Sequence, residues 1–341
     1  MTTQPAPVVS APIRDDEAVT RLHEGYKRLT SQIHQVIVGQ DNVIHAVLCS
    51  MLAGGHCLIQ GVPGLAKTLL VHSIADALHL SFNRIQFTPD LMPSDITGTD
   101  IIQEDAETHQ RRYEFIRGPI FANVVLADEI NRTPPKTQAA LLQAMQEREV
   151  TASGRTYKLD APFFILATQN PIEQEGTYPL PEAALDRFMF MVYIDYPSSE
   201  EEHQIVKQTT TRAKQPVAPV LNKEEIVLFQ NLVRSAPVSD AVIEYCVRLA
   251  RATRPTDPLA TDMVKKYLKW GSGPRAGQYM VLGAKALALI MGRVTPSFDD
   301  VRKVCKMVLR HRVITNFDAE ADGISRETVI DDLIKRIAPP K

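Results

Sequence analysis

The fold of this chain is decided by the stretch Gly61-Val62-Pro63-Gly64-Leu65-Ala66-Lys67-Thr68. It follows an apolar run at 56–60 and precedes a helical-looking segment at 69–80, so we expect a strand, a tight turn and a helix in that order. Glycines in such a turn let backbone N–H groups approach phosphate oxygens. Lys67 can reach the β- and γ-phosphates of a nucleoside triphosphate, and Thr68 can ligate Mg²⁺. The residues expected to contact the nucleotide are Gly61, Val62, Pro63, Gly64, Leu65, Ala66, Lys67, Thr68 and Leu69.

Ala66 departs from the usual pattern of such a loop, in which glycine stands directly before the lysine. A methyl group is tolerated there only if the residue has a negative φ, because a Cβ atom disfavours the left-handed region. We therefore expect a negative φ at Ala66. Taken alone, the stretch is also compatible with a chance turn before a helix.

A second apolar run, at 123–127, ends in the acidic pair Asp128-Glu129. Such a run is typical of a strand that is buried on both faces. Asp128 would hold Mg²⁺, usually through water, and Glu129 would orient or deprotonate the water that attacks the γ-phosphate. The alternative is a solvated acidic turn after a buried strand, but the loop upstream favours the first interpretation.

A third apolar run, at 163–168, continues into Gln169-Asn170-Pro171. Polar side chains at the carboxyl end of a strand lie at the crevice where open α/β sheets bind ligands. Asn170 is therefore placed to donate a hydrogen bond to the γ-phosphate or to contact the attacking water. By itself an Asn-Pro pair is more often a turn.

The order of these motifs, followed by Leu185-Asp186-Arg187-Phe188 and Gly273-Pro274-Arg275-Ala276, resembles that of an AAA+ ATPase. Within that superfamily the chain is similar to the MoxR group, most closely at 118–121, 126–138 and 170–187. An alanine before the loop lysine is also common in that group. The resemblance covers 17–335 and implies an α/β P-loop core with a central, mostly parallel sheet, followed by a smaller α-helical lid.

The prolines Pro5, Pro7 and Pro12 predict a flexible N-terminal tail at 1–15. The resemblance implies an AAA+ nucleotide-binding domain at 16–197 and a lid domain at 198–341. The alternation of strands and helices stops near 197, and helical segments follow at 199–210, 223–235, 240–253, 277–291, 297–313 and 326–337. A connection interrupted by prolines lies at 213–219. Two inserts are expected, a helix-2 insert within 88–117 and a pre-sensor-1 β-hairpin at 149–159.

The resemblance also implies roles for two arginines and for the segment around Gly39. Arg187 resembles an arginine finger, which reaches the γ-phosphate bound by a neighbouring subunit, and Arg275 resembles the sensor-2 arginine, which reaches the phosphates of its own subunit. Val38 and Gly39 match the segment that lines the adenine pocket. Simpler interpretations stay open: a surface ion pair at Arg187, a proline-initiated helix at Arg275, and an ordinary connection at Gly39.

The function implied by the resemblance is an Mg²⁺-dependent ATPase that binds ATP and ADP and self-associates into a ring, expected to be a hexamer. Such proteins carry out chaperone-like remodelling, maturation, or cofactor or metal insertion of client complexes, usually with a von Willebrand factor A domain partner. Three alternatives stay open: a DNA-associated AAA+ motor, the ATPase subunit of a magnesium chelatase-like complex, and an assembly protein gated by nucleotide.

Composition sets further bounds on the 341 residues. A net charge of −2 argues against a broad electropositive track for DNA, although Arg155 and Lys158 could form a local one. No apolar run is long enough to span a membrane, so we expect a soluble, cytoplasmic protein without an integral membrane segment. The four cysteines lack zinc-site spacing and are expected to be small buried residues, which leaves Mg²⁺ as the expected metal.

Overall fold

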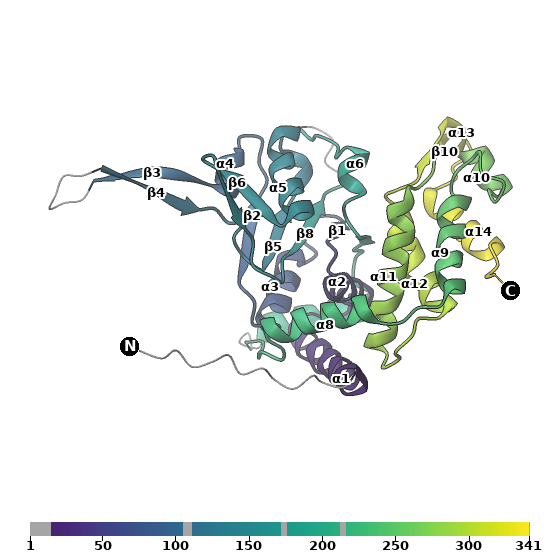
Figure 1. Cartoon of the computed structure of the whole chain (residues 1–341), viewed down its shortest axis with the longest axis horizontal. Helices are drawn as coiled ribbons and strands as arrows, with labels where there is room; N and C mark the ends of the chain where they lie inside the picture. The colour runs from purple at the N-terminus through teal and green to yellow at the C-terminus, as the bar shows by residue number, and fades with distance from the viewer. Residues whose placement is uncertain (1–14, 105–110, 172–175, 212–215, 341) are drawn as a thin grey trace, which may run out of the picture.

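Parallel strands form the centre of the molecule (Figure 1). The computed structural model describes residues 15–104, 111–171, 176–211 and 216–340. Its main sheet has five strands, which pair in the order β2 (Phe82–Gln86), β5 (Val124–Asp128), β8 (Phe164–Gln169), β1 (Cys57–Gln60) and β9 (Phe190–Tyr193). All four pairings are parallel. The predicted α/β core with a parallel sheet is confirmed.

Helices cover both faces of this sheet, which explains why its strands are continuous apolar runs. In β5, Val124 and Leu126 belong to an apolar cluster that includes α2 (Asp41–Leu52) and α3 (Lys67–Ala77). Val125 belongs to the cluster on the other face, with residues of α5 (Pro135–Glu147). Successive side chains of a strand alternate between faces, so β5 is buried at every residue.

Two hairpins extend the core. After the short helix α4 (Pro93–Thr97), strands β3 (Gly98–Glu104) and β4 (Arg111–Arg117) pair antiparallel and project from the core as a ribbon (Figure 1). The part of the predicted helix-2 insert at 105–110 lies outside the described residues. Strands β6 (Glu149–Ala152) and β7 (Arg155–Lys158) form the second hairpin, which confirms the prediction at 149–159.

The C-terminal part is helical, as predicted. Its long helices are α7 (Ser199–Thr211), α8 (Lys223–Ser235), α9 (Asp240–Ala252), α11 (Pro274–Ile290), α12 (Phe298–Leu309) and α14 (Arg326–Arg336). Four short elements were not predicted: α10 (Asp262–Tyr267), β10 (Leu268–Trp270), β11 (Ile314–Thr315) and α13 (Phe317–Ala321). Within the described ranges, no single helix is long and apolar enough to cross a bilayer, and only α8 with α9, which are bent by 91°, reach that length and composition together.

Helix α8 lies along the core rather than within the distal lid (Figure 1). Its Gln230 Nε2 donates to the carbonyl of Met51 in α2 (2.8 Å), and its Glu225 pairs with Arg21 of α1 (Asp15–Ile33). A domain boundary at 198 therefore assigns to the lid a helix that contacts the core. The described chain begins with α1 at Asp15, inside the predicted tail at 1–15, whose other residues lie outside the described ranges.

The four cysteines, Cys49, Cys57, Cys246 and Cys305, are all buried free thiols, as predicted. Burial raises the pKa of the Cys57 thiol to about 12, so this thiol stays protonated and behaves as a small apolar group.

Candidate active site

The polar residues that follow the central strands meet at one edge of the sheet. Gln60, the last residue of β1, lies opposite Gln169 of β8, and Ala127 of β5 lies opposite Ala167. The backbone N–H of Gly61 donates to the carbonyl of Gln169 (3.2 Å). The phosphate-binding loop, the acidic pair and Asn170 therefore emerge side by side, where parallel sheets bind ligands.

The loop itself corrects one prediction. Ala66 has a φ of 54°, in the left-handed region, and not the negative φ expected from its methyl group. The chain must reverse direction between the loop and α3, which starts at Lys67, and the residue before that helix takes up the reversal. A left-handed conformation costs a residue with a Cβ on the order of 1–2 kcal/mol, which the surrounding structure must offset.

Lys67 lies across the loop. Its Nζ donates to the carbonyls of Gly61 (2.8 Å) and Val62 (3.1 Å). Partial burial lowers the pKa of this amine, while the nearby charges of Asp128 and Glu129 oppose that shift. The amine thus lies near both the loop carbonyls and the acidic pair.

Asp128 is buried and tightly held. Its Oδ1 accepts a hydrogen bond from Thr168 Oγ1 (2.6 Å), and its Oδ2 accepts from Arg84 Nε (3.1 Å) and Nη2 (2.6 Å). Arg84 belongs to β2, the strand next to β5. The Asp128 carboxylate and the Thr68 hydroxyl are oxygen donors of the kind Mg²⁺ prefers, and Asp128 already pairs with a cationic group. These residues fit a nucleotide-bound Mg²⁺.

The side chain of Glu129 is also oriented by neighbours. Its Oε2 accepts from Gln86 Nε2 (2.8 Å) and lies 3.3 Å from Arg132 Nη1. Its backbone N–H donates to Thr168 Oγ1 (2.9 Å), so one hydroxyl contacts both members of the acidic pair. Asn170 follows β8 directly and is 5% exposed, and β8 is the neighbour of β5, the strand that ends at Asp128.

The segment expected to line the adenine pocket makes a tight contact with α7. Gly39 has a φ of 66°, and a Cβ on it would lie 2.1 Å from Oε1 of Glu201. The neighbouring Gln40 donates from Nε2 to the carbonyl of Asp195 (3.0 Å). A cavity of about 240 Å³ lies beside the phosphate-binding loop, and the predicted Val38 and Gly39 are not among the residues that line it: Gln60, Gly61, Val62, Pro171, Tyr193, Ile194, Asp195 and Tyr196.

Arg275 lies next to the core segment that carries Arg187. Nη1 of Arg275 donates to Oδ2 of Asp186 (2.6 Å), the residue before Arg187. The hydroxyl of Tyr279, one turn along α11 from Arg275, donates to the carbonyl of Arg187 (3.1 Å). The structure therefore groups Arg275 with Arg187, and it groups Lys67 with Asp128 and Glu129.

Sequence reasoning missed four residues around the site: Arg84, Gln86, Asp186 and Arg312. Arg84 and Gln86 are two residues apart on β2, so they lie on one face of the sheet, and they hydrogen-bond Asp128 and Glu129. The pairing of β2 with β5, which sequence reasoning did not assign, is the signal that would have found them. Arg312 contacts Asp186 across 126 residues, and no local pattern marks that pair.

The class of protein follows from the families that the two domains match. Residues 56–190 match the model of the ATPase family associated with various cellular activities (AAA), and residues 260–333 match the AAA lid domain. A protein named chaperone MoxR1 from Mycobacterium tuberculosis is 41% identical over 98% of this chain and 88% of its own length. Protein MoxR from Methylorubrum extorquens is 27% identical over 94% of this chain and 96% of its own length.

The fold comparison agrees. The crystal structure of a Cytophaga hutchinsonii protein classed as an ATPase superposes with a TM-score of 0.89 at 38% identity, covering 96% of this chain and 98% of that one. The chain is thus an AAA+ ATPase with an α-helical lid. It belongs to the MoxR family of these ATPases, which implies nucleotide binding and ATP hydrolysis.

Proposed function

We propose that this chain is an Mg²⁺-dependent ATPase that works as a ring and couples ATP turnover to the remodelling or maturation of client protein complexes. One observation carries the proposal. Lys67, Asp128 and Glu129 converge at one edge of the sheet, whereas Arg187 lies on a segment that the lid holds. Each subunit would then supply one half of an active site and take the other half from its neighbour.

The chemistry follows from the residues at the sheet edge. Lys67 would exchange the carbonyls of Gly61 and Val62 for the β- and γ-phosphates. Thr68 and Asp128 would hold Mg²⁺, which supplies charge neutralisation at the phosphates when bound.

Glu129, after β5, and Asn170, after β8, would act on the attacking water. Glu129, oriented by Gln86, would accept its proton, and Asn170 would hydrogen-bond the water or the γ-phosphate. Val38 and Gly39 would contact the adenine.

We also propose that Arg187 and Arg275 both serve the nucleotide of the neighbouring subunit. The ion pair between Arg275 and Asp186 supports this assignment, because it places Arg275 beside Arg187. It differs from the expectation that Arg275 reaches the phosphates of its own subunit. A hexameric ring, a von Willebrand factor A domain partner and client remodelling are extended to this chain from its family, in which one relative is named a chaperone.

ATP hydrolysis per subunit, measured across protein concentrations with the assembly mass determined in the same samples, tests the proposal. Turnover per subunit should rise as the ring assembles, because a missing arginine finger costs on the order of 10³-fold or more in rate. Glu129→Gln should bind ATP with unchanged affinity but lose turnover by about 10²- to 10⁴-fold.

Two results would oppose the proposal. Turnover per subunit that is independent of concentration while the mass changes would show that each active site is complete within one chain. An assembled protein that binds ATP but shows no turnover dependent on Glu129 would leave a nucleotide-gated scaffold as the better reading.

A further inference from the structure

Arg312 makes an unusual set of contacts for a lid residue. It lies three residues beyond the end of α12, and its side chain is 1% exposed. Nε donates to Oδ1 of Asp186 (2.8 Å), and Nη2 donates to the carbonyls of Asp186 (2.7 Å) and Phe188 (2.6 Å). Nη1 donates to the carbonyl of Val308 (2.5 Å) and lies 3.4 Å from that of Met189. The guanidinium thus brackets Arg187 on both sides.

The lid donates a hydrogen bond to every backbone carbonyl of residues 186–189. Arg312 donates to the carbonyls of Asp186, Phe188 and Met189, and the Tyr279 hydroxyl donates to the carbonyl of Arg187. The segment 186–189 joins the short helix α6 (Glu182–Leu185) to β9. We call it the finger segment. Its backbone N–H groups are bonded within the core, so the core holds one side of the finger segment and the lid holds the other.

Ion pairs strengthen the attachment of the finger segment to the lid. Asp186 accepts hydrogen bonds from both Arg312 and Arg275, so one core carboxylate joins two lid cations. Burial lowers the pKa of Arg312, and the charge of Asp186 opposes that shift. Moving the finger segment away from the lid would leave a buried cation unpaired, which is strongly unfavourable.

We propose that Arg312 is a positioning residue for Arg187: it fixes the backbone of the finger segment to the lid, so that the arginine offered to a neighbour moves with the lid of its own subunit. The inference rests on the proposed role of Arg187 in a neighbouring active site. The competing explanation is structural only, in which Arg312 holds lid and core together and affects every function equally.

Mixed assemblies separate the two explanations. Lys67→Ala subunits have no working nucleotide site but carry an intact finger segment, and Arg187→Ala subunits have the opposite defect. An equal mixture of the two should regain turnover that neither has alone. If it does not, the proposed function fails at this step, independently of Arg312.

Given that rescue, Arg312→Lys is the decisive variant. It should lower turnover about 10- to 100-fold, since a misplacement of about 1 Å has effects of that size, while ATP affinity changes by less than about twofold. Lys67→Ala subunits should restore its turnover, and Arg187→Ala subunits should not. The double variant with Arg187→Ala should be no slower than Arg187→Ala alone, because both changes remove one interaction.

The proposal is overturned if Lys67→Ala fails to rescue Arg312→Lys, or if the double variant loses the product of the two single effects. Arg310→Lys is the matched control. Arg310 is also buried at the end of α12, but it stacks on Tyr193 (4.3 Å) and pairs with Glu327 (3.2 Å). Any turnover loss in this variant should not respond to Lys67→Ala subunits.

Tyr279→Phe keeps the inference testable if Arg312→Lys does not fold. It removes only the hydroxyl that donates to the Arg187 carbonyl. Turnover should fall about two- to tenfold, the range of a single hydrogen bond, with the same rescue by Lys67→Ala. Unchanged turnover, or a loss without rescue, would overturn the proposal.

Discussion

Two residues of the nucleotide-binding loop adopt positive φ, at unequal cost. Gly64 has a φ of 87°, and a Cβ added to it would meet no heavy atom within 4 Å. Ala66 has a φ of 54° and already carries a Cβ. Backbone conformation therefore sets the effect of adding a methyl group at Gly64, and it is the main factor at Ala66, which is exposed.

We expect Gly64→Ala to lower the free energy of unfolding by about 1–2 kcal/mol, the cost of left-handed backbone for a residue with a Cβ. Ala66→Gly should raise it by less than about 1 kcal/mol, because the relieved strain is partly offset by the greater freedom of glycine in the unfolded chain. Urea unfolding without nucleotide measures both values. A Gly64→Ala variant as stable as the parent would contradict the argument.

The sequence predicted which residues form this loop, but it did not predict the φ of Ala66. Residue type reports only a local preference. The reversal at Ala66 is imposed by β1 on one side and α3 on the other, so tertiary structure overrides the preference.

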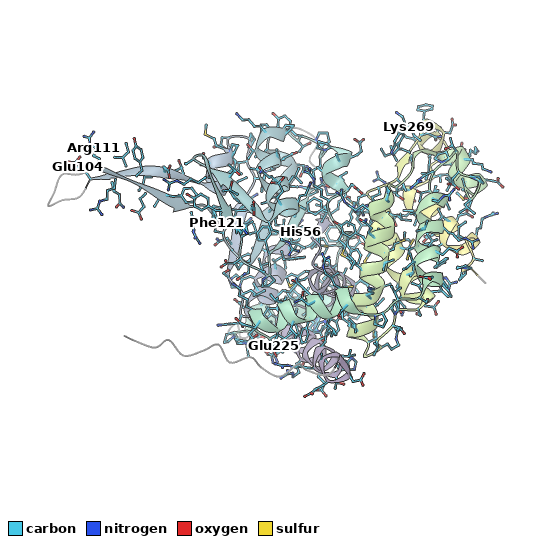
Figure 2. The ribbon with its side chains drawn as sticks, in the orientation of Figure 1. His56, Glu104, Arg111, Phe121, Glu225 and Lys269 are labelled. Atoms are coloured by element: carbon cyan, nitrogen blue, oxygen red, sulfur yellow. The ribbon has the colours of Figure 1, made fainter. Side chains whose placement is uncertain are left out.

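At the scale of elements, His56, which lies in the core (labelled in Figure 2), connects two elements that are distant in sequence. Its Nδ1 accepts from the backbone N–H of Ile165 in β8 (3.0 Å), and its Nε2 donates to the carbonyl of Met145 in α5 (3.2 Å). Burial lowers the pKa of His56 to about 4, although the bond to Met145 opposes that shift. The imidazole is neutral in the fold.

This low pKa predicts a loss of stability in mild acid. The folded pKa of about 4 lies below the ordinary value of 6.5, so the unfolded chain binds the proton first. The stabilisation is complete above about pH 6.5 and is lost as the pH falls toward about 4, amounting to about 3 kcal/mol. Urea unfolding across this range measures it. His56→Gln should flatten the pH dependence, whereas the control His72→Gln, on an exposed helix face, should not; equal slopes in His56→Gln and the parent would refute the assignment.

Long elements were predictable from apolar runs and helical periodicity, and short ones were not. β10 and β11 are too short to show a period, and they form because distant backbones meet. The backbone N–H of Asn316, for example, donates to the carbonyl of Tyr267 (2.9 Å). In the same way, each site motif was visible after its strand, but the sharing of Asp186 by residues 89 and 126 positions away was not.

At the scale of the whole molecule, the ribbon of β3 and β4 divides into a fixed root and an exposed remainder. At the root, Phe115 stacks on Tyr157 of the second hairpin (4.4 Å between ring centroids) and meets Phe121 edge on. Farther out, Ile102 and Tyr113 are 58% and 77% exposed. Glu104 and Arg111 lie at the far end of the described ribbon, well away from the lid (Figure 2).

We therefore expect the remainder of the ribbon to be dispensable for the fold and for the proposed self-association. Asp100 and Phe115 are paired across the two strands, so residues 101–114 can be replaced by an Asn-Gly turn. This truncation should change the free energy of unfolding by less than about 0.5 kcal/mol, as expected for surface changes. Assembly mass and ATP turnover, measured in the same samples, should match those of the parent.

Tyr157→Ala, which removes the aromatic stack at the root, should lower the free energy of unfolding by more than the truncation does, because an aromatic pair contributes about 0.5–1.5 kcal/mol beyond the area it buries. If the truncated protein folds but no longer assembles, the ribbon belongs to the interface between subunits. If it assembles and turns over ATP normally, the exposed side chains of Ile102 and Tyr113 are free to contact a client of the proposed ring.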